Sequence, residues 1–309
     1  MRNIKKSGGI LCQGVAVKYA AVEKMRPGYP IWILCCALQV SVSGYHNWKN
    51  RLHQKPSKQN LREVAAVRAA HKTTRGVYGA LRLHREFLAE GHYVSIWKVK
   101  KIRREEGLTI THSQKRICTT KSNHGEPIAE NVLNRQFVQH APNRVWVSDI
   151  TYIPTAEGWL YLAGIKDVFT KEIVGFHMAP NMDKGLVLTA LRRAYTAHRP
   201  AAGLLLHSDK GSQYCSHVYQ KTINKYKMIC SMSRKGECHN NAPMESFWGL
   251  LKNELVHQRH FRTRREATHA ITEYITVFYN HQRRQAALNY LSPAAFAKNY
   301  KQGQYAAAA

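Results

Sequence analysis

The sequence predicts an α/β fold, in which a mixed five-stranded sheet is flanked by helices and preceded by all-α helix-turn-helix modules. Before residue 112 the apolar residues recur three or four positions apart, which is typical of amphipathic helices. After residue 139 they form short alternating or continuous runs, which are typical of strands, with helical patterns between the later runs. A chain of 309 residues can hold two or three domains of this kind.

Residues 1–57 form the first predicted unit, a basic lead followed by a small helix-turn-helix-like segment. Residues 1–28 show little periodicity, so we expect a flexible lead there. Helical spacing begins after Pro30 and resumes after a turn at residues 40–43. Two short helices joined by a tight turn outline a helix-turn-helix. A helical hairpin that packs on the next domain explains the same pattern.

Residues 58–112 form the second predicted unit, a helical DNA-binding domain of three helices. Ser95 is the expected N-cap of the third helix, which is strongly basic. From residue 51 to residue 125 the chain has 17 Lys and Arg against 5 Glu, which favours DNA binding over an ordinary solvated helix face. The expected DNA contacts of the third helix are Lys98, Lys100, Lys101, Arg103 and Arg104.

Residues 113–139 are polar and are predicted to be an interdomain linker. Residues 140–257 show the order three strands, helix, strand, helix, strand, helix, which is the order of an RNase H-like fold. The predicted strands are residues 144–154, 158–168, 171–178, 204–207 and 228–232. Residues 258–309 are expected to hold a long helix, Arg264 to Arg284, and a basic tail.

The charge of the chain points to a polyanionic partner. Lys and Arg number 47 against 19 acidic residues, a formal charge of +28, so double-stranded DNA is the expected partner. The apolar run from Ile31 to Val42 is shorter than the roughly 20 residues that a membrane span needs. The seven cysteines include no Cys-x-x-Cys pair, so we expect reduced cytoplasmic thiols. Cys35 and Cys36 have no zinc-ligand spacing to nearby histidines and are expected in a core.

Only four aspartates occur, which makes the search for metal ligands short. Asp183 is explained as a helix cap, and Asp167 as a hydrogen-bond acceptor near a hairpin turn. Asp149 lies in mid-strand among apolar residues, where a lone charge is costly unless a cation offsets it. Asp209 comes just after a predicted buried strand. Asp149 and Asp209 are therefore the candidate ligands among the aspartates.

A glutamate on a helix completes the candidate set. Glu245 is predicted in a helix capped by Asn240 or Asn241, with Pro243 in its first turn. Lys252, seven residues later, returns to the same helix face. Carboxylate oxygens suit Mg²⁺, and two such ions, with Mn²⁺ as a substitute, would assist phosphoryl transfer.

The three acids also stand in recognisable sequence contexts. Asp149 lies in Asp-Ile-Thr-Tyr-Ile, Asp209 in His-Ser-Asp-Lys-Gly-Ser-Gln-Tyr, and Glu245 in Asn-Ala-Pro-Met-Glu-Ser-Phe. These contexts resemble the DDE motif of retroviral-integrase-type transposases. The flanking motifs make the chain similar to the second-frame (OrfB) product of the insertion sequence three family. They are Val77-Tyr78-Gly79 with Arg82, Ser233-Arg234-Lys235-Gly236, Tyr279-Asn280, Arg283-Arg284, Leu288 and Ser292-Pro293, within about residues 30 to 298.

Two departures from that family's pattern are visible. The family usually has Asp-Asn-Ala before the glutamate, where this chain has Asn240-Asn241-Ala242. It usually has His in the terminal Arg-rich motif, where Gln285 stands here. Neither departure replaces one of the three acids.

The resemblance implies a DNA transposase. Such an enzyme nicks a transposon end and joins the freed 3′-hydroxyl to the other end of the same strand, and a circular intermediate then integrates at a target. The resemblance also implies roles for individual residues. Asp149, Asp209 and Glu245 would bind two Mg²⁺ ions, Lys252 would contact phosphate near the cleaved bond, His207 or Asn241 would support the site, and Arg283 and Arg284 would contact DNA.

Partners and location follow from the same resemblance. Joining two ends implies a homo-oligomer, at least a dimer. No leucine-zipper heptads are visible near the N-terminus, so a first-frame (OrfA) partner or a frameshift fusion is expected. The bacterial cytoplasm, in association with the nucleoid, is the expected location.

Two other functions compete with this interpretation. A DNA-binding regulator without catalysis would bind specific DNA but would not cleave it, and the intact acidic triad argues against it. A nuclease of the same fold would cut DNA without joining strands. The helix-turn-helix-like units argue against the nuclease.

Overall fold

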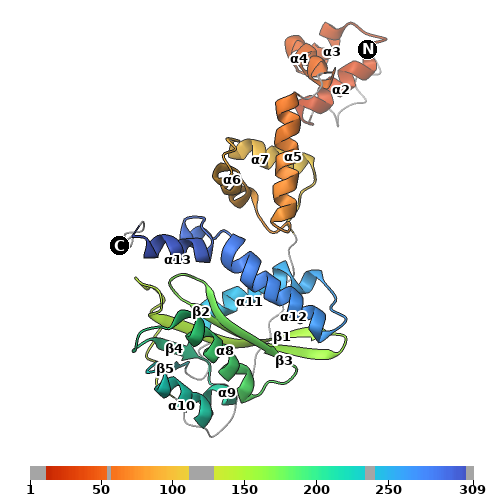
Figure 1. Ribbon diagram of the computed structural model, residues 1–309. Coiled ribbons are helices and arrows are strands. Elements are labelled where there is room, and N and C mark those ends of the chain that lie inside the picture. Colours follow the sequence, from red (N-terminus) through yellow and green to blue (C-terminus); the bar gives the residue numbers. More distant parts are fainter. Residues whose placement is uncertain (1–11, 54–56, 111–128, 234–240, 304–309) are drawn as a thin grey trace. The chain divides into compact units, whose positions relative to one another are not determined.

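The chain divides into two compact units, residues 1–65 and residues 66–309. The computed structural model describes residues 12–53, 57–110, 129–233 and 241–303 (Figure 1). Most of the predicted linker, the signature residues Arg234 to Gly236 and the candidate cap Asn240 lie outside these ranges. No helix within them is long and apolar enough to cross a membrane.

The first unit contains a helix that the sequence pattern did not predict. Its helices are α2 (Val15–Met25), α3 (Ile31–Ala37) and α4 (Val42–His53). The expectation of a flexible lead is therefore wrong for α2, an alanine-rich segment whose composition favours a helix. Tyr19 and Val22 lie one turn apart on α2 and pack in a core with Leu34 and Cys35. Cys36 is exposed, so only the first of the two adjacent cysteines lies in the core.

Three further helices follow, and the first of them, α5, crosses the division at residue 65. They are α5 (Lys58–Thr73), α6 (Ala80–Ala89) and α7 (Ile96–Glu105). Ser95 is the N-cap of α7, as predicted, because its hydroxyl accepts a hydrogen bond from the Lys98 backbone N–H. Val99 and Ile102 are buried on one face of α7, whereas Lys100 and Arg104 are exposed.

The five predicted strands form one mixed sheet in the order β3-β2-β1-β4-β5. Its strands are β1 (Val145–Thr155), β2 (Gly158–Asp167), β3 (Ile173–Ala179), β4 (Leu205–Ser208) and β5 (Ile229–Met232). The pairs β1–β2 and β2–β3 are antiparallel, whereas β1–β4 and β4–β5 are parallel. This arrangement, with helices on both faces, confirms the predicted RNase H-like α/β fold.

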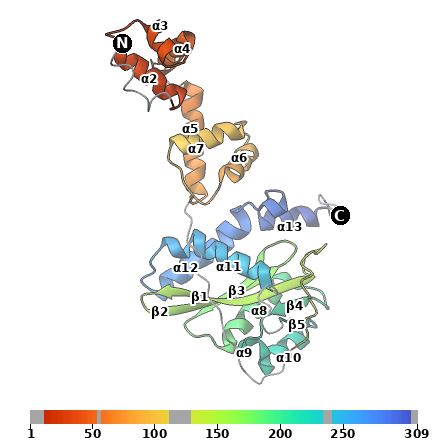
Figure 2. The same cartoon turned by 180° about the vertical axis from the view of Figure 1, so that it is seen from behind.

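Helices cover both faces of the sheet, as Figures 1 and 2 show from opposite sides. One layer contains α8 (Lys184–His198), α9 (Ser212–Cys215) and α10 (His217–Lys225), and the other contains α11 (Ala242–Glu254) and α12 (Arg264–Glu273). Strand glycines permit close packing in both layers. A Cβ on Gly175 would lie 2.7 Å from Ala190 O of α8, and one on Gly164 would lie 2.7 Å from the Trp248 ring of α11.

Two of the four aspartates have structural partners, as predicted. Asp183 caps α8 by accepting a hydrogen bond from the Leu186 N–H at 3.0 Å. Asp167 accepts hydrogen bonds from the backbone N–H groups of Asn143, Phe169 and Thr170. Each carboxylate is thereby used in holding a helix start or a turn.

The predicted long C-terminal helix, Arg264 to Arg284, is helical without a gap as far as Gln282, but its winding changes from α to π after Glu273. After α12 the chain continues as a π-helical segment, η4 (Tyr274–Gln282). A short 3-10 helix, η5 (Ala286–Leu288), and then α13 (Pro293–Lys301) follow. Asn280 of η4 bonds both backbone groups of Ile173 on β3, each at 3.0 Å. The π-helical turns thus end beside the outer edge of the sheet, a placement that apolar periodicity does not predict.

Candidate active site

Asp149 lies in the middle of β1, where its carboxylate accepts two hydrogen bonds. The Trp248 indole N–H donates to one oxygen at 2.9 Å, and the Ile150 backbone N–H donates to the other at 2.8 Å. Burial, with smaller contributions from the negative charges of Asp209 and Glu245, raises the pKa of Asp149 to about 7, although the two hydrogen bonds lower it. The three predicted acids therefore act on one another electrostatically.

Asp209 is brought beside Asp149 by the parallel pairing of β1 with β4. Val147 is level with His207 in that register, so two more residues along each strand lead to Asp149 and Asp209. β4 ends at Ser208, and Asp209 then accepts a hydrogen bond from the Gly211 N–H at 2.9 Å. The aspartate thus lies directly after the carboxyl end of its strand, which neighbours β1 in the sheet.

Glu245 comes from the first turn of α11 and is exposed. Gly164 pairs directly with Asp149 and has no side chain, so Met244 and Trp248 of α11 pack against the strand at this point. Trp248 is one turn after Glu245 and bonds to Asp149, which ties the helix that carries the glutamate to the strand that carries the aspartate. Glycine at position 164 makes this close approach possible.

The three acids fit a hard divalent cation. All three donors are carboxylates, and the pKa of Asp149 is raised by burial and by the like charges of Asp209 and Glu245, both of which a bound cation would offset. Within the described ranges, no three His, Cys, Asp or Glu side chains are already gathered as a complete metal site.

The two residues expected to support the site are both buried. His207 is hydrogen-bonded through its ring nitrogens to Ser231 at 2.9 Å and Ser233 at 3.1 Å, so it joins β4 to β5. Asn241 precedes α11, but its side chain does not cap the helix as predicted. Its Nδ2 instead donates to Ser148 O at 2.9 Å, and its buried Oδ1 has no partner among the described residues.

The basic residues expected to contact DNA are in different environments. Lys252 lies on α11, two turns after Glu245, with its ammonium 5.0 Å from the centroid of the Tyr152 ring. On α7, Lys100 and Arg104 are exposed and Lys98 is half-buried. Lys101 lies 3.8 Å from Glu105 in a surface ion pair.

Three expected DNA contacts are engaged inside the protein. Arg103 is half-buried and donates to Leu108 O at 3.1 Å. Arg283 is only 1% exposed and forms an ion pair with the Glu254 carboxylate at 2.6 Å, so the expectation that it contacts DNA does not fit its burial. Arg284 is half-buried and pairs with Glu86. A count of positive charges therefore overstates the number available to DNA.

Sequence reasoning missed several residues beside the acids. Trp248 and Gly164 were not singled out, although a glycine inside a strand often marks a close approach of another element. Ser148 and Tyr214, whose hydroxyls lie 3.0 Å apart, connect β1 to α9 next to Asp149. These contacts join segments that are remote in sequence, so local patterns contain little signal for them.

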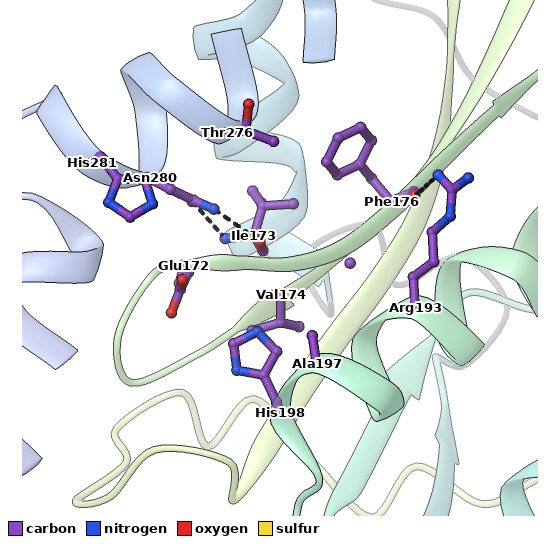
Figure 3. A pocket seen from close by; sticks show the side chains of 11 residues that line it. Glu172, Ile173, Val174, Phe176, Arg193, Ala197, His198, Thr276, Asn280 and His281 are labelled. Atoms are coloured by element: carbon purple, nitrogen blue, oxygen red, sulfur yellow. Dashed lines mark hydrogen bonds between the residues drawn. The ribbon is translucent and has the colours of Figure 1, made fainter. Parts of the chain in front are cut away.

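A cavity of about 290 Å³ lies elsewhere, at the outer edge of β3 (Figure 3). The side chain of Asn280 faces Ile173 there, and an Arg193 N–H donates to Phe176 O at 3.2 Å. These side chains occupy backbone groups that a strand edge would otherwise expose. None of the three predicted acids lines this cavity.

Three protein-family matches cover most of the chain. Residues 139–238 and residues 245–300 match two families described as integrase core domain, and residues 58–116 match a family described as HTH-like domain.

Two sequence relatives extend over nearly their whole length. The chain is 46% identical over 269 residues to the insertion element IS600 uncharacterized 31 kDa protein of Shigella sonnei, with 87% of this chain and 99% of that protein covered. It is 35% identical over 282 residues to the transposase InsF for insertion sequence IS3A of Escherichia coli (strain K12), with 91% and 98% covered. Among solved structures, the HTLV-2 integrase catalytic core domain in complex with magnesium (trimeric form) aligns at a TM-score of 0.40 and 15% identity, over 50% of this chain and 97% of that one.

Proposed function

Because the chain belongs to the insertion sequence three family of transposases, we propose that Asp149, Asp209 and Glu245 are the catalytic carboxylates with which it cleaves and joins DNA. The chain is a DNA transposase with an integrase core, and thus a polynucleotidyl transferase. The observation that carries the assignment of the site is geometric: the β1–β4 register brings Asp149 and Asp209 to the same level of the sheet, and the Trp248 bond ties the helix of Glu245 to Asp149.

Asp149, Asp209 and Glu245 would together hold two Mg²⁺ ions, with Mn²⁺ as a substitute. When bound, such ions activate the attacking oxygen and stabilise the charge on the leaving oxygen. The Trp248 N–H donates to one oxygen of Asp149, and the backbone N–H of Ile150, on the same strand as Asp149, donates to the other. Lys252, on the helix of Glu245, would contact a DNA phosphate near the cleaved bond.

The reaction has two phosphoryl-transfer steps of the same kind. In the first, a water oxygen forms a bond to the phosphorus at a transposon end, and the bond from phosphorus to the 3′-oxygen breaks to release a 3′-hydroxyl. In the second, the oxygen of this 3′-hydroxyl forms a bond to another phosphorus of the DNA, and the bond from that phosphorus to its own 3′-oxygen breaks. Both steps depend on positioning and charge neutralisation more than on covalent chemistry by the protein.

DNA is held by the basic surface outside the acidic site. Lys100 and Arg104 of α7 are exposed cations within the match to the HTH-like family, so they would bind the phosphates of a transposon end. Two ends must meet for joining, so a homo-oligomer of at least two chains is part of the proposal. A first-frame partner or fusion would supply further contacts to the ends.

The test is strand joining with labelled ends of the insertion sequence in Mg²⁺. Asp209→Asn is expected to lower the joining rate by about 10³-fold or more, because the ions supply several kcal/mol of transition-state stabilisation. Asp183→Asn is the matched control, since asparagine also caps a helix and Asp183 only caps α8. Equal joining by wild type and Asp209→Asn would refute the assignment of the site.

A second measurement does not depend on activity. Mn²⁺ binding to the DNA-free protein, followed by electron paramagnetic resonance, should weaken in Asp209→Asn and stay unchanged in Asp183→Asn. Unchanged Mn²⁺ affinity in Asp209→Asn would exclude Asp209 as a ligand.

A further inference from the structure

Lys166 is a buried cation that the proposed mechanism does not use. It lies on β2, next to Asp167, and is only 5% exposed. Burial, together with the nearby positive charge of Arg283, lowers the pKa of Lys166 to about 7. An amine at such a position costs stability relative to an apolar side chain. A buried lysine therefore calls for a role other than core packing.

The contacts of Lys166 lead to the helix of Glu245. Its ammonium donates a hydrogen bond to Pro243 O at 3.0 Å and lies 6.0 Å from the centroid of the Phe247 ring. Pro243 is in the first turn of α11, two residues before Glu245. Lys166 thus reaches from the sheet to the backbone of the turn that presents the glutamate.

That turn has no side-chain cap of its own, because the Asn241 side chain is directed elsewhere. Two bonds to the sheet hold it instead. Asn241 Nδ2 donates to Ser148 O on β1, next to Asp149, and Lys166 Nζ donates to Pro243 O from β2. The helix dipole does not explain the second bond, because a cation is unfavourable at a helix N-terminus.

We propose that Lys166 is a positioning residue, which fixes the first turn of α11 on β2 and so places Glu245 opposite Asp149 for catalysis. The proposal rests on the proposed function of the three acids. Displacement of a reacting group by about 1 Å can cost ~100-fold in rate, so one backbone anchor in this turn can matter to chemistry. The anchor acts through Glu245 and touches none of the reacting atoms.

Lys166→Met separates this role from a structural one. Methionine keeps the length and the apolar stem of lysine but has no N–H donor. It also removes the buried amine, so the melting temperature is expected to stay equal or to rise. The rate constant for joining at saturating DNA should nevertheless fall by about 100-fold, with the KM for DNA unchanged.

Lys171→Met is the matched control. Lys171 is a half-buried lysine that also donates to a backbone carbonyl, Val168 O at 2.6 Å, but that bond lies in the turn between β2 and β3. We expect the joining rate of Lys171→Met to equal that of wild type. Lys166→Arg keeps a donor and is expected to restore part of the rate that Lys166→Met loses.

Hydrogen exchange gives a readout that does not depend on catalysis. In Lys166→Met, the amides after Pro243 in the first turns of α11 should exchange faster, while those of β2 keep their protection. Lys171→Met should leave α11 protected. This measurement also carries the test if the variant protein is obtained in low yield, because it needs no transposon DNA.

The outcomes separate the two proposals. If wild type joins DNA and Lys166→Met loses no more activity than Lys171→Met, the positioning role is wrong and the acidic site stands. If Lys166→Met loses activity only in proportion to a fall in melting temperature, Lys166 is merely structural. If Asp209→Asn joins as wild type does, the proposed function fails first, whatever Lys166→Met does.

Discussion

Asp149 of β1 interacts with residues from several other parts of the fold. Its carboxylate is bonded by Trp248 of α11 and lies within the electrostatic influence of Asp209 and Glu245. Burial and these two like charges together keep its pKa near 7. A negative charge on Asp149 is therefore unfavourable in the folded protein unless a cation is bound nearby.

This residue leads to a dependence of stability on pH. The pKa of Asp149 is about 7 in the folded chain against an ordinary value of 3.8, so only the folded state holds this proton between those values. Protonation of Asp149 thus stabilises the fold at low pH, and the contribution is lost as the pH rises from about 4 to about 7. As the pH rises over this range, the melting temperature of the metal-free wild type should fall relative to that of Asp149→Asn.

Thermal unfolding in chelator from pH 4 to pH 8 measures the effect. Added Mg²⁺ should restore the melting temperature of wild type at pH 8 and leave that of Asp149→Asn unchanged. Parallel pH curves for the two metal-free proteins would show that Asp149 titrates normally.

At the scale of elements, the position of the site depends on how closely helices approach the sheet. α11 packs on β2 at Gly164, and α8 packs on β3 at Gly175. A side chain at either position would meet the opposing helix, although the two contacts differ in kind. The neighbour of Gly164 is the Trp248 ring, whereas two of the atoms next to Gly175 belong to the α8 backbone.

Gly175→Ala should therefore destabilise the fold. The new Cβ would lie 2.7 Å from Ala190 O and 2.8 Å from Ala194 N, so α8 would have to move as a unit. Overpacking of this kind costs about 1–3 kcal/mol. Urea denaturation should show that loss in the free energy of unfolding.

Gly249→Ala on α11 provides the control. No atom lies within 4 Å of a Cβ at this helical position, and alanine is favoured over glycine in a helix by about 1 kcal/mol. Equal effects of the two substitutions on the free energy of unfolding would mean that α8 accommodates the extra methyl group.

At the scale of the whole molecule, the charge of +28 sets affinity for DNA but does not identify the contacts. Lys100 and Arg104 are exposed on α7, whereas Arg283 is enclosed with Glu254. Counterion release depends only on cations that reach phosphates. The exposed residues of α7 should therefore account for part of the salt dependence, and Arg283 for none.

The slope of log affinity against log salt is negative, and the double variant Lys100→Ala and Arg104→Ala should make it less steep by about 2, one for each lost phosphate contact. Fluorescence anisotropy with a labelled transposon end at several salt concentrations measures this slope. Lys221→Ala with Lys225→Ala on α10 removes the same charge elsewhere and should leave the slope unchanged. Equal slopes for the two double variants would mean that α7 contributes only through net charge.

Much of the fold could be predicted from local pattern. The five strands begin and end within about two residues of the predicted bounds, because side-chain alternation and turn residues are encoded next to each other in the chain. The caps Asp183 and Ser95 were predictable for the same reason. Helix α2 was missed because its burial depends on partners in later helices, and the π-helical segment because its period differs from 3.6.

The sequence by itself determined the α/β class, the succession of strands and helices along the chain and the three acids that we assign to catalysis, since residue type and spacing are local properties that motifs retain. Only the tertiary structure decided what surrounds those acids. It placed Trp248 on Asp149 and Lys166 on the first turn of α11, and it enclosed Arg283 with Glu254. These contacts depend on which segments meet after folding, and burial and electrostatic coupling arise only when they do.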